Sequence, residues 1–253
     1  MDEAAGERVD GLWARRLGCE AALLRTPGIH LLQADTAAAR AGVFLLARDG
    51  ALLVRGESPV VHALVSRLGD RTSLPGPDLV CAALGARVER IVGPAFLGYR
   101  ESPPQTPAGA GALRSLGLSD RAALVRLRDA VPVEEWEHSG LSLDVSGAMI
   151  AGAFEDERLL AAASFEMIFG VAAHLGVLTH PSARGLGAGS RVVAAAAQAA
   201  AARGLLLQYQ TLESNRPSLR IAERLGFRLY ATSLAVSLLD ATKTYDRWQD
   251  QER

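Results

Sequence analysis

The apolar and polar positions in the second half of the chain predict alternating strands and helices. Three apolar runs, at 147–154, 158–168 and 171–179, are separated by short breaks, a pattern typical of antiparallel strands joined by tight turns. The elements expected after them are a helix at 190–203, a strand at 205–212, a helix at 215–227 and a final strand or strands at 228–239. This order predicts a mixed, mostly antiparallel sheet. Its parallel pair would be 171–179 and 205–212, because the intervening helix supplies a right-handed crossover.

The first half shows a similar succession of elements. Helical spacing of apolar residues predicts a helix over 9–26, and Asp49-Gly50 is a hairpin signal between two apolar runs. The other elements expected here are a strand at 29–35, a helix at 58–69 with Ser58 as its cap, a helix at 77–85 and a strand at 88–101. This half is therefore expected to be a small α+β unit. The similar order raises the hypothesis of a degenerate copy of the second half.

A stretch rich in Pro, Gly and Ala divides the chain. Residues 102–112 read SPPQTPAGAGA, a composition that favours an extended linker. After it, a helix over 116–130 with Ser119 as its cap and a short helix at 132–141 are expected. The predicted organisation is an N-terminal α+β domain at 1–101, a linker at 102–112, a second domain at 113–240 and a polar tail at 241–253.

Composition narrows the classes of function. The 253 residues are 49% hydrophobic and carry a formal net charge of -1, which favours a buried core and does not favour a nucleic-acid surface. No apolar stretch approaches the ~18 residues of a membrane span, and the acidic N-terminus lacks the apolar region of a signal peptide. Cys19 and Cys81 lack metal-ligand spacing, and the histidines form no cluster. We expect a cytoplasmic protein with reduced thiols and no metal, membrane or nucleic-acid partner.

Candidate chemistry centres on residues 179–193, THPSARGLGAGSRVV, which join an apolar run to the helix at 190–203. The spacing differs from the GxGxxG of dinucleotide-binding folds. A Walker A motif needs a lysine, and Lys243 is the only one in the chain. A short loop that feeds a helix N-terminus remains, where N–H groups and the helix dipole favour an anion. Glycines would let a diphosphate approach the backbone. An ordinary tight turn is the alternative.

These residues resemble a known family. The run VLTHPSARGLGAG is similar to the acyl-CoA-binding signature of the GNAT superfamily of N-acetyltransferases, in which Arg184, Gly187 and Gly189 match [RQ]-x-x-G-x-[GA]. Downstream, Asn215 and the Leu225-Gly226-Phe227 segment resemble the family's second motif. The resemblance covers roughly 111–240, and the two motifs occur in the family's order.

The resemblance implies a fold, a cofactor and a reaction. It implies an α+β, acyl-CoA N-acyltransferase-like fold and an acetyl transfer from acetyl-CoA to a primary amine, without a covalent enzyme intermediate. The pantetheine arm would bind to the main chain of Val177, Leu178 and Thr179 as an added strand, and Asn215 would face it. The diphosphate would bind Arg184 and the N–H groups of the loop, namely Gly185, Leu186, Gly187, Ala188, Gly189 and Ser190.

The sequence departs from the family where proton transfer is concerned. Many relatives carry a tyrosine as general acid where this chain has Ala222, and some carry a glutamate base where it has Gln210. The candidate replacements are His174, Glu166, Glu213 and Tyr230. His174 and Glu166 are preferred for proton transfer, because an imidazole titrates near neutral pH and Glu166 lies between apolar neighbours. A core histidine and a solvated glutamate are the alternatives.

The acceptor is less well indicated. The resemblance implies that residues 134–141 line its site, where Trp136 and the glutamates at 134, 135 and 137 would attract a cation. A solvated helix face is the alternative. A small-molecule amine is the preferred acceptor, and a homodimer is compatible with the sequence. A catalytically silent acyl-CoA-binding module and a scaffold protein with a GNAT-like fold remain as other functions.

Overall fold

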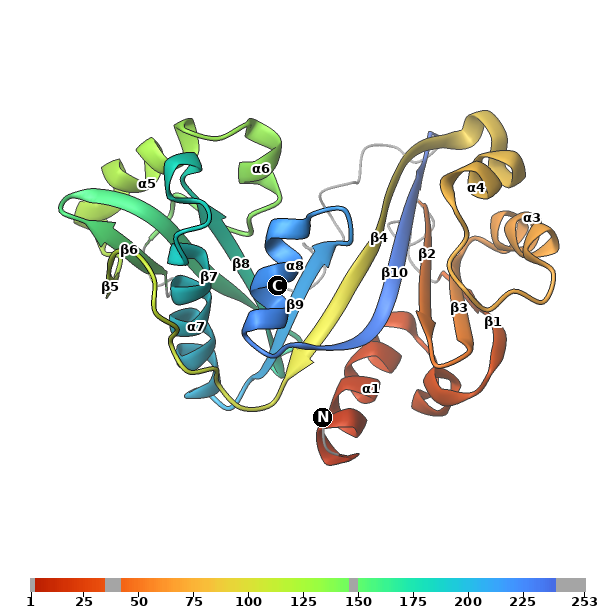
Figure 1. The fold of residues 1–253 in the computed structure, drawn as a ribbon. Helices are drawn as coiled ribbons and strands as arrows, with labels where there is room; N and C mark the ends of the chain where they lie inside the picture. Colours follow the sequence, from red (N-terminus) through yellow and green to blue (C-terminus); the bar gives the residue numbers. More distant parts are fainter. Residues whose placement is uncertain (1–2, 35–41, 146–149, 240–253) are drawn as a thin grey trace. The chain divides into compact units, whose positions relative to one another are not determined.

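The computed structural model describes residues 3–34, 42–145 and 150–239 (Figure 1). The chain forms two compact units. The first unit comprises Met1–Leu97, Thr211–Arg216 and Leu229–Arg253, and the second comprises Gly98–Gln210 and Pro217–Arg228. The expected tail at 241–253 and the start of the expected strand at 147–154 lie outside the described residues.

The first unit is built on strands in the order β1-β3-β2-β10-β4. Its elements are α1 (Glu3–Leu17), the 3-10 helix η1 (Ala21–Arg25), β1 (Gly28–Gln33), β2 (Gly42–Arg48), β3 (Ala51–Gly56), α3 (Ser58–Leu68), α4 (Pro77–Leu84), η2 (Gly85–Arg87), β4 (Val88–Arg100) and β10 (Arg228–Leu238). Helices α3 and α4 pack against one face through a core that includes Val54, Leu64 and Leu234. On β2, Phe44 lies between two residues of that core and stacks on Trp13 of α1 with ring centroids 5.9 Å apart. Helix α1 therefore covers the other face.

Three local expectations are corrected in these elements. The expected helix at 9–26 ends at Leu17, because Gly18 adopts a φ of 68° and breaks the helical path. The N-cap of α3 is Glu57 instead of Ser58, and its side chain makes no capping hydrogen bond. Ser119 lies inside a 3-10 turn that precedes the helix at 121–129, so it is not a cap. The hairpin at Asp49-Gly50 is confirmed, with positive φ at both residues.

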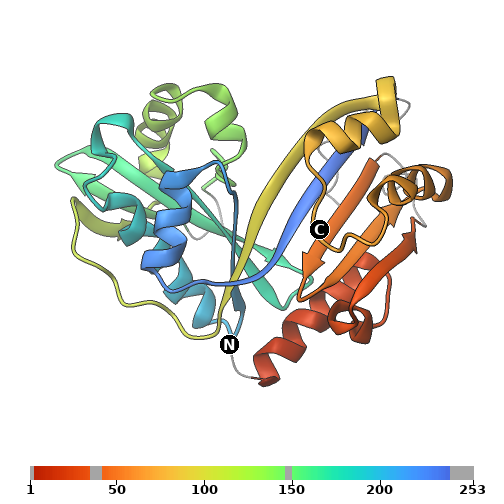
Figure 2. The same ribbon diagram turned by 45° about the vertical axis from the view of Figure 1, so that its right-hand side comes forward.

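The second unit is a mixed sheet with the strand order β9-β8-β7-β6-β5. Its elements are β5 (Ala112–Ser115), η3 (Leu118–Asp120), α5 (Arg121–Asp129), α6 (Val133–Glu137), β6 (Ala151–Glu155), β7 (Arg158–Ile168), β8 (Ala172–Thr179), η4 (Pro181–Ala183), α7 (Ala188–Ala201), β9 (Leu206–Leu212) and α8 (Arg216–Arg224). The pairs from β5 to β8 are antiparallel, although β5 itself was not among the expected strands. Strands β8 and β9 are parallel, as the sequence predicted. Helix α7 is the crossover between them (Figure 2).

Helices cover both faces of this second sheet. The core under α5 joins Leu124 and Leu127 to Ala162 of β7 and Leu178 of β8. On the opposite face of β7, Phe165 lies 5.2 Å from the guanidinium of Arg203, just beyond the end of α7. Alternate residues of β7 and β8 therefore face α5 or α7.

The division of the chain into two units differs from the expected domains in strand β10 and in the expected linker. Strand β10 pairs antiparallel with β2 from Thr232 to Ser237 and groups with the first unit, although it falls within the expected second domain at 113–240. Residues 104–110, part of the expected linker, lie along α7. The Gln198 amide donates to the Pro104 carbonyl oxygen at 2.9 Å, and the Ala110 N–H donates to the Leu186 carbonyl oxygen at 2.9 Å.

Candidate functional site

The parallel pair β8–β9 opens after three residues. Its register joins Ala172–His174 to Leu206–Gln208 and, within the described residues, extends no further, whereas β8 stays paired with β7 as far as Thr179. Figure 1 shows the two strands diverging toward their carboxyl ends. The edge of β8 from Leu175 to Thr179 that points away from β7 is therefore open to an added strand. This edge includes Val177, Leu178 and Thr179, the residues expected to bind the pantetheine arm.

A row of polar residues crosses the sheet where the strands separate. Glu166 on β7 is in register with His174 on β8, which is in register with Gln208 on β9. Paired residues put their side chains on one face with Cβ atoms about 4.5–5.5 Å apart. Ala162 and Leu178, four residues along β7 and β8, place this face on the α5 side. The structure thus brings the two candidate catalytic residues together, both half-buried.

The glycine loop connects β8 to α7. Gly185 and Gly187 adopt φ values of 80° and 81°, the left-handed region that favours glycine, and Gly187 is the N-cap of α7. The first helical hydrogen bond runs from the Arg191 N–H to the Gly187 carbonyl oxygen. The N–H groups of Ala188, Gly189 and Ser190 precede it and belong to the helix turn that lacks intrahelical acceptors. The loop therefore has the backbone geometry of an anion site.

Two loop glycines are also required by packing within the protein. A Cβ on Gly189 would lie 2.7 Å from Oγ1 of Thr179 and 3.2 Å from Cδ1 of Ile221. A Cβ on Gly187 would lie 3.1 Å from the Ala108 carbonyl oxygen, in the segment that runs along α7. The loop is most accessible at Arg184, Gly185 and Leu186, which are exposed, whereas residues 188–190 are buried. A larger residue at 187 or 189 would therefore disturb the loop before any ligand bound.

Arg184 is ion-paired with the short helix α6. Its Nη2 atom lies 2.6 Å from Oε2 of Glu135, and the two side chains are 46% and 42% exposed. Just beyond α6, the Ser139 backbone crosses β8 so closely that Gly176 has no room for a Cβ, and the Ser164 hydroxyl donates to the Gly140 carbonyl oxygen at 3.1 Å. The segment expected to line the acceptor site thus lies over β7 and β8.

The remaining candidates lie elsewhere. Asn215 is in the turn between β9 and α8 and groups with the first unit, as does Glu213, whose N–H donates to the Pro94 carbonyl oxygen. Ala222 is fully buried in α8, and Gln210 is exposed on β9.

Tyr230 is not placed as a general acid. It lies on β10 in the first unit, where its hydroxyl donates to Oδ1 of Asp10 at 2.8 Å and Arg48 stacks over its ring. Burial, then the Asp10 charge, raises the pKa of Tyr230 far above its usual value. Asp10 is itself buried and also contacts Arg25 and Arg48, so this cluster is fully engaged in the first unit.

Sequence reasoning missed Gln208 and Tyr99. Gln208 is 1% exposed and its amide donates to the Tyr99 hydroxyl at 2.7 Å. Within the described residues its Oε1 atom has no hydrogen-bond partner. A buried acceptor beside His174 costs free energy unless it is satisfied, so Gln208 marks this end of the polar row as a polar site. The signal was available: Gln208 interrupts the apolar run LLLQY.

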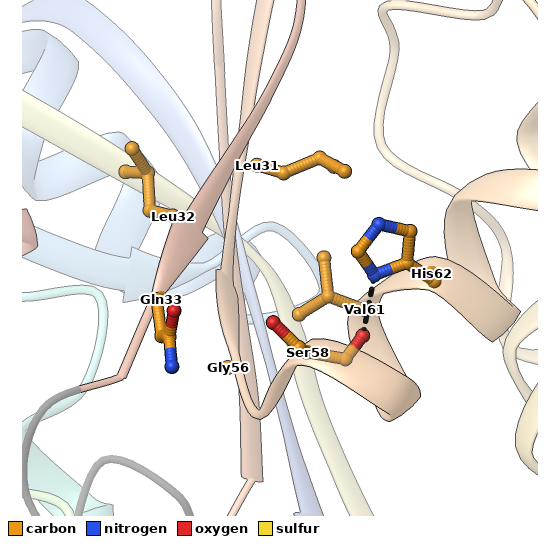
Figure 3. Close-up of a pocket in the computed structure, with 7 residues that line it drawn as sticks. All are labelled: Leu31, Leu32, Gln33, Gly56, Ser58, Val61 and His62. Atoms are coloured by element: carbon orange, nitrogen blue, oxygen red, sulfur yellow. Dashed lines mark hydrogen bonds between the residues drawn. The ribbon is translucent and has the colours of Figure 1, made fainter.

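The structure has a separate cavity in the first unit. It measures about 270 Å³ and lies between the end of β1 and the start of α3 (Figure 3). It is lined by Leu31, Leu32, Gln33, Gly56, Ser58, Val61 and His62. The His62 imidazole contacts the Ser58 carbonyl oxygen at 2.7 Å, and no lining side chain is an acid, a lysine or an arginine. None of the candidate site residues lies there, so we assign it no function.

Metal and membrane features are not found in the part of the chain that the structure describes. No group of three or more His, Cys, Asp or Glu residues is placed to hold a metal ion. Among the described helices, none combines the length and apolar character needed to cross a bilayer.

Comparison with known proteins identifies the second half. Residues 120–227 match the family model described as "Acetyltransferase (GNAT) family". A search of curated proteins gave no significant match.

Solved structures of GNAT proteins resemble the chain. A structure from Novosphingobium aromaticivorans assigned to the GNAT family is 25% identical, covers 72% of this chain and 82% of its own, and has a TM-score of 0.48. A GNAT acetyltransferase from Colwellia psychrerythraea is 18% identical over 62% of this chain and 60% of its own, with a TM-score of 0.46. A structure from Salmonella typhimurium, described as an acetyltransferase with its cofactor acetyl-CoA, is 18% identical over 54% and 98%, with a TM-score of 0.40.

The expected fold class is confirmed by the mixed sheet flanked by helices and by the family match. The family match includes the polar row from β7 to β9, the open edge of β8 and the glycine loop. The C-terminal half of this chain, at residues 120–227, carries an acetyltransferase domain of the GNAT family.

Proposed function

We propose that the second unit transfers an acetyl group from acetyl-CoA to the primary amine of a small molecule. The observation that carries this proposal is the opening of the β8–β9 pair directly after His174, on the strand that leads into the glycine loop. An extended acyl-thioester arm needs an open strand edge, and its diphosphate needs an anion site at the end of that strand. The open edge of β8 and the glycine loop that follows this strand support the proposal.

The residues present fit acetyl-CoA. The main chain of Val177, Leu178 and Thr179 would pair with the pantetheine amides. The loop N–H groups from Gly185 to Ser190 and the Arg184 guanidinium would bind the diphosphate. The thioester would then lie near His174, where the strands separate. A β8 backbone N–H at this point would stabilise the oxyanion that forms as the carbonyl is attacked.

The reaction is a direct transfer. The nitrogen of the neutral amine attacks the thioester carbon and a C–N bond forms. The C–S bond then breaks, the thiolate leaves as CoA, and the amine proton passes to a base. Holding both substrates together supplies much of the rate gain, because a bimolecular step becomes effectively unimolecular. A thiolate leaves readily without a strong acid, so Ala222 in place of a tyrosine is tolerated.

His174 is the proposed base, with Glu166 as its partner. The two residues are in register on neighbouring strands, on the face that α5 and α6 cover. A carboxylate beside an imidazole stabilises the imidazolium that forms when the base takes a proton. Water is the alternative base, through which the proton would reach bulk solvent.

A cysteine nucleophile is not part of the proposal. Both thiols lie in the first unit, with Cys81 exposed on α4 and Cys19 half-buried after α1. Burial raises the pKa of the Cys19 thiol, which disfavours the reactive thiolate. We therefore expect sequential kinetics with both substrates bound together, and undiminished turnover in a Cys19→Ser, Cys81→Ser double variant. Ping-pong kinetics or a trapped acetyl-cysteine would contradict this mechanism.

The acceptor is proposed to be a small cationic amine. Glu134 and Glu137 of α6 are exposed beside Trp136, and the segment that follows crosses β8 above Gly176. Carboxylates at the mouth of a site raise the local concentration of a cation.

The experiment is titration calorimetry with acetyl-CoA and CoA, followed by a thiol-release assay over a panel of primary amines. Binding with turnover on one or more amines is the expected result. Binding without turnover on any amine would favour the silent acyl-CoA-binding module. Absence of binding would overturn both functions.

A further inference from the structure

A cluster of basic and hydroxyl groups lies at the carboxyl end of β8, outside the polar row. The Arg158 guanidinium, at the start of β7, donates to the Ser182 hydroxyl at 2.7 Å and contacts Nδ1 of His180 at 3.2 Å. The Ser182 N–H also donates to this Nδ1, at 3.2 Å. The Ser182 hydroxyl lies 2.9 Å from the same Nδ1 atom, and the Arg158 Nη2 atom also lies 3.4 Å from Nε2, so both ring nitrogens of His180 have a partner in the cluster. Three side chains, one from β7, one from η4 and one from the residue before η4, are thus gathered where the glycine loop begins.

The cluster carries an excess of positive charge. Arg184 follows two residues after Ser182. Burial, then the charges of Arg158 and Arg184, lowers the pKa of His180. Glu135 pairs with Arg184. Glu155, Asp156 and Glu157 precede Arg158 in sequence, yet within the described residues no carboxylate lies within ion-pair distance of its guanidinium. The positive charge of the Arg158 guanidinium is therefore not balanced by a described carboxylate, and the group lies at the carboxyl end of β8.

We propose that Arg158, with His180 and Ser182, binds the 3′-phosphate of CoA and so selects CoA over its dephosphorylated form. This inference rests on the proposed function. In that function the arm runs from the glycine loop back along β8 toward His174. The nucleotide end must then continue past the carboxyl end of β8, where the cluster lies.

The chemistry of the cluster fits a phosphate monoester. Such a group carries about -1.5 to -2 charges near pH 7 and three acceptor oxygens. A guanidinium presents paired donors that match two phosphate oxygens, and the Ser182 hydroxyl and the His180 ring lie beside it. Arg158 is exposed and His180 half-buried, so the phosphate could reach both without a rearrangement of the core.

An acidic group on the acceptor could use the same donors. The test therefore compares two cofactor forms that differ only in the 3′-phosphate. Calorimetric titrations of the whole chain with CoA and with 3′-dephospho-CoA are made for the unmodified protein, for Arg158→Gln and for Arg126→Gln. Arg126 is an exposed arginine on α5 and serves as the matched control for loss of one charge.

The expected result is a preference for CoA of about tenfold in the unmodified protein, in line with one charge-assisted contact. The preference should persist in Arg126→Gln and disappear in Arg158→Gln, with the affinity for 3′-dephospho-CoA unchanged. That unchanged affinity also shows that the variant is folded. If Arg158→Gln does not fold, Ser182→Ala carries the test and should reduce the preference.

Three outcomes would overturn the proposal. One is equal affinity of the unmodified protein for the two forms. Another is a preference for CoA that persists in Arg158→Gln. That result would favour an acidic group of the acceptor as the ligand of the cluster. The third is an equal loss of both affinities in Arg158→Gln. Failure of the unmodified protein to bind either form would instead overturn the proposed function itself, and the subsite with it.

Discussion

The Nη2 atom of Arg184 lies 2.6 Å from Oε2 of Glu135, which joins the glycine loop to the short helix α6. The two residues are 49 positions apart in the chain. In the proposed function, Arg184 binds the cofactor diphosphate while α6 lines the acceptor site. The Glu135 carboxylate and the cofactor diphosphate would therefore compete for the Arg184 guanidinium.

Removing this carboxylate should strengthen cofactor binding. In Glu135→Gln the Arg184 guanidinium no longer has to leave an ion pair, so CoA should bind about two- to fivefold more tightly, the range expected for an exposed pair. Titration calorimetry at low ionic strength measures the change. Glu134→Gln, a neighbouring change of the same charge on α6, is the control and should alter affinity less. Weaker binding in Glu135→Gln would show that the pair organises the loop.

Gly189 is expected to matter first for folding. A Cβ there would lie 2.7 Å from Oγ1 of Thr179, closer than such contacts allow, so Gly189→Ala should lower the free energy of unfolding by about 1–3 kcal/mol. Urea unfolding measures this. Gly117→Ala is the control, because a Cβ on Gly117 meets no atom within 4 Å. Thr179→Ala removes the clash, so the double variant should recover part of the loss. If the losses in the free energy of unfolding caused by Gly189→Ala and Thr179→Ala simply add, the contact between these two residues is not the source of the strain.

Asp120 should stabilise the second unit in a pH-dependent way. Both of its carboxylate oxygens lie 2.7 Å from Arg114, and Oδ2 also accepts the Gly117 N–H. These contacts, Arg114 first, lower the pKa of Asp120 from 3.8 to about 2. The folded state thus favours the ionised form. The stabilisation is complete above pH 3.8 and is lost as the pH falls through about 2.

Asp120→Asn should therefore lower the free energy of unfolding by about 1 kcal/mol at pH 7, a figure reduced for the exposure of Arg114. The difference between variant and unmodified protein should shrink below pH 3.8. Denaturant titrations across pH 2–7 measure it. Asp129→Asn, at an exposed pair with Arg128, is the control and should change stability less. A difference that is constant with pH would contradict the assignment.

Loss of His174 should separate catalysis from binding. His174→Ala is expected to lower turnover about 10²- to 10³-fold while CoA affinity stays unchanged, because only proton transfer is affected. Glu166→Gln should cause a smaller loss, since it acts through His174. Steady-state kinetics over a range of pH measures both, and the exposed His62 in the first unit provides the control variant His62→Ala. Normal turnover in His174→Ala would contradict the assignment of His174 as the base. The histidine would then have a structural role, and water would accept the proton.

The sequence alone was enough for the features that depend on neighbouring residues. The three apolar runs predicted the antiparallel strands, and the segment after them predicted a helix at 190–203, which the structure has at Ala188–Ala201. The parallel crossover followed from this order of elements. The glycine loop was also visible, since left-handed backbone at Gly185 and Gly187 requires a residue without a Cβ. The two linked motifs pointed to the family that the model match then showed.

Strand pairing depended on the tertiary structure. Strand β10 pairs with β2 from Thr232 to Ser237, and no local signal in these apolar strands selects one partner strand over another. The alignment of Glu166, His174 and Gln208 also comes from register, because a shift of one residue would turn each side chain to the other face.

The sequence also did not predict the polar contacts between residues far apart in the chain. Residues 104–110 read as a linker because they are rich in Pro, Gly and Ala. They bind α7 largely through main-chain carbonyl and N–H groups, which every residue carries and which no sequence pattern distinguishes. The contacts of Arg184 with Glu135 and of Arg158 with Ser182 join residues 49 and 24 positions apart. An arginine can reach many partners from its position, and only the folded backbone decides which carboxylate, hydroxyl or open space lies within its reach.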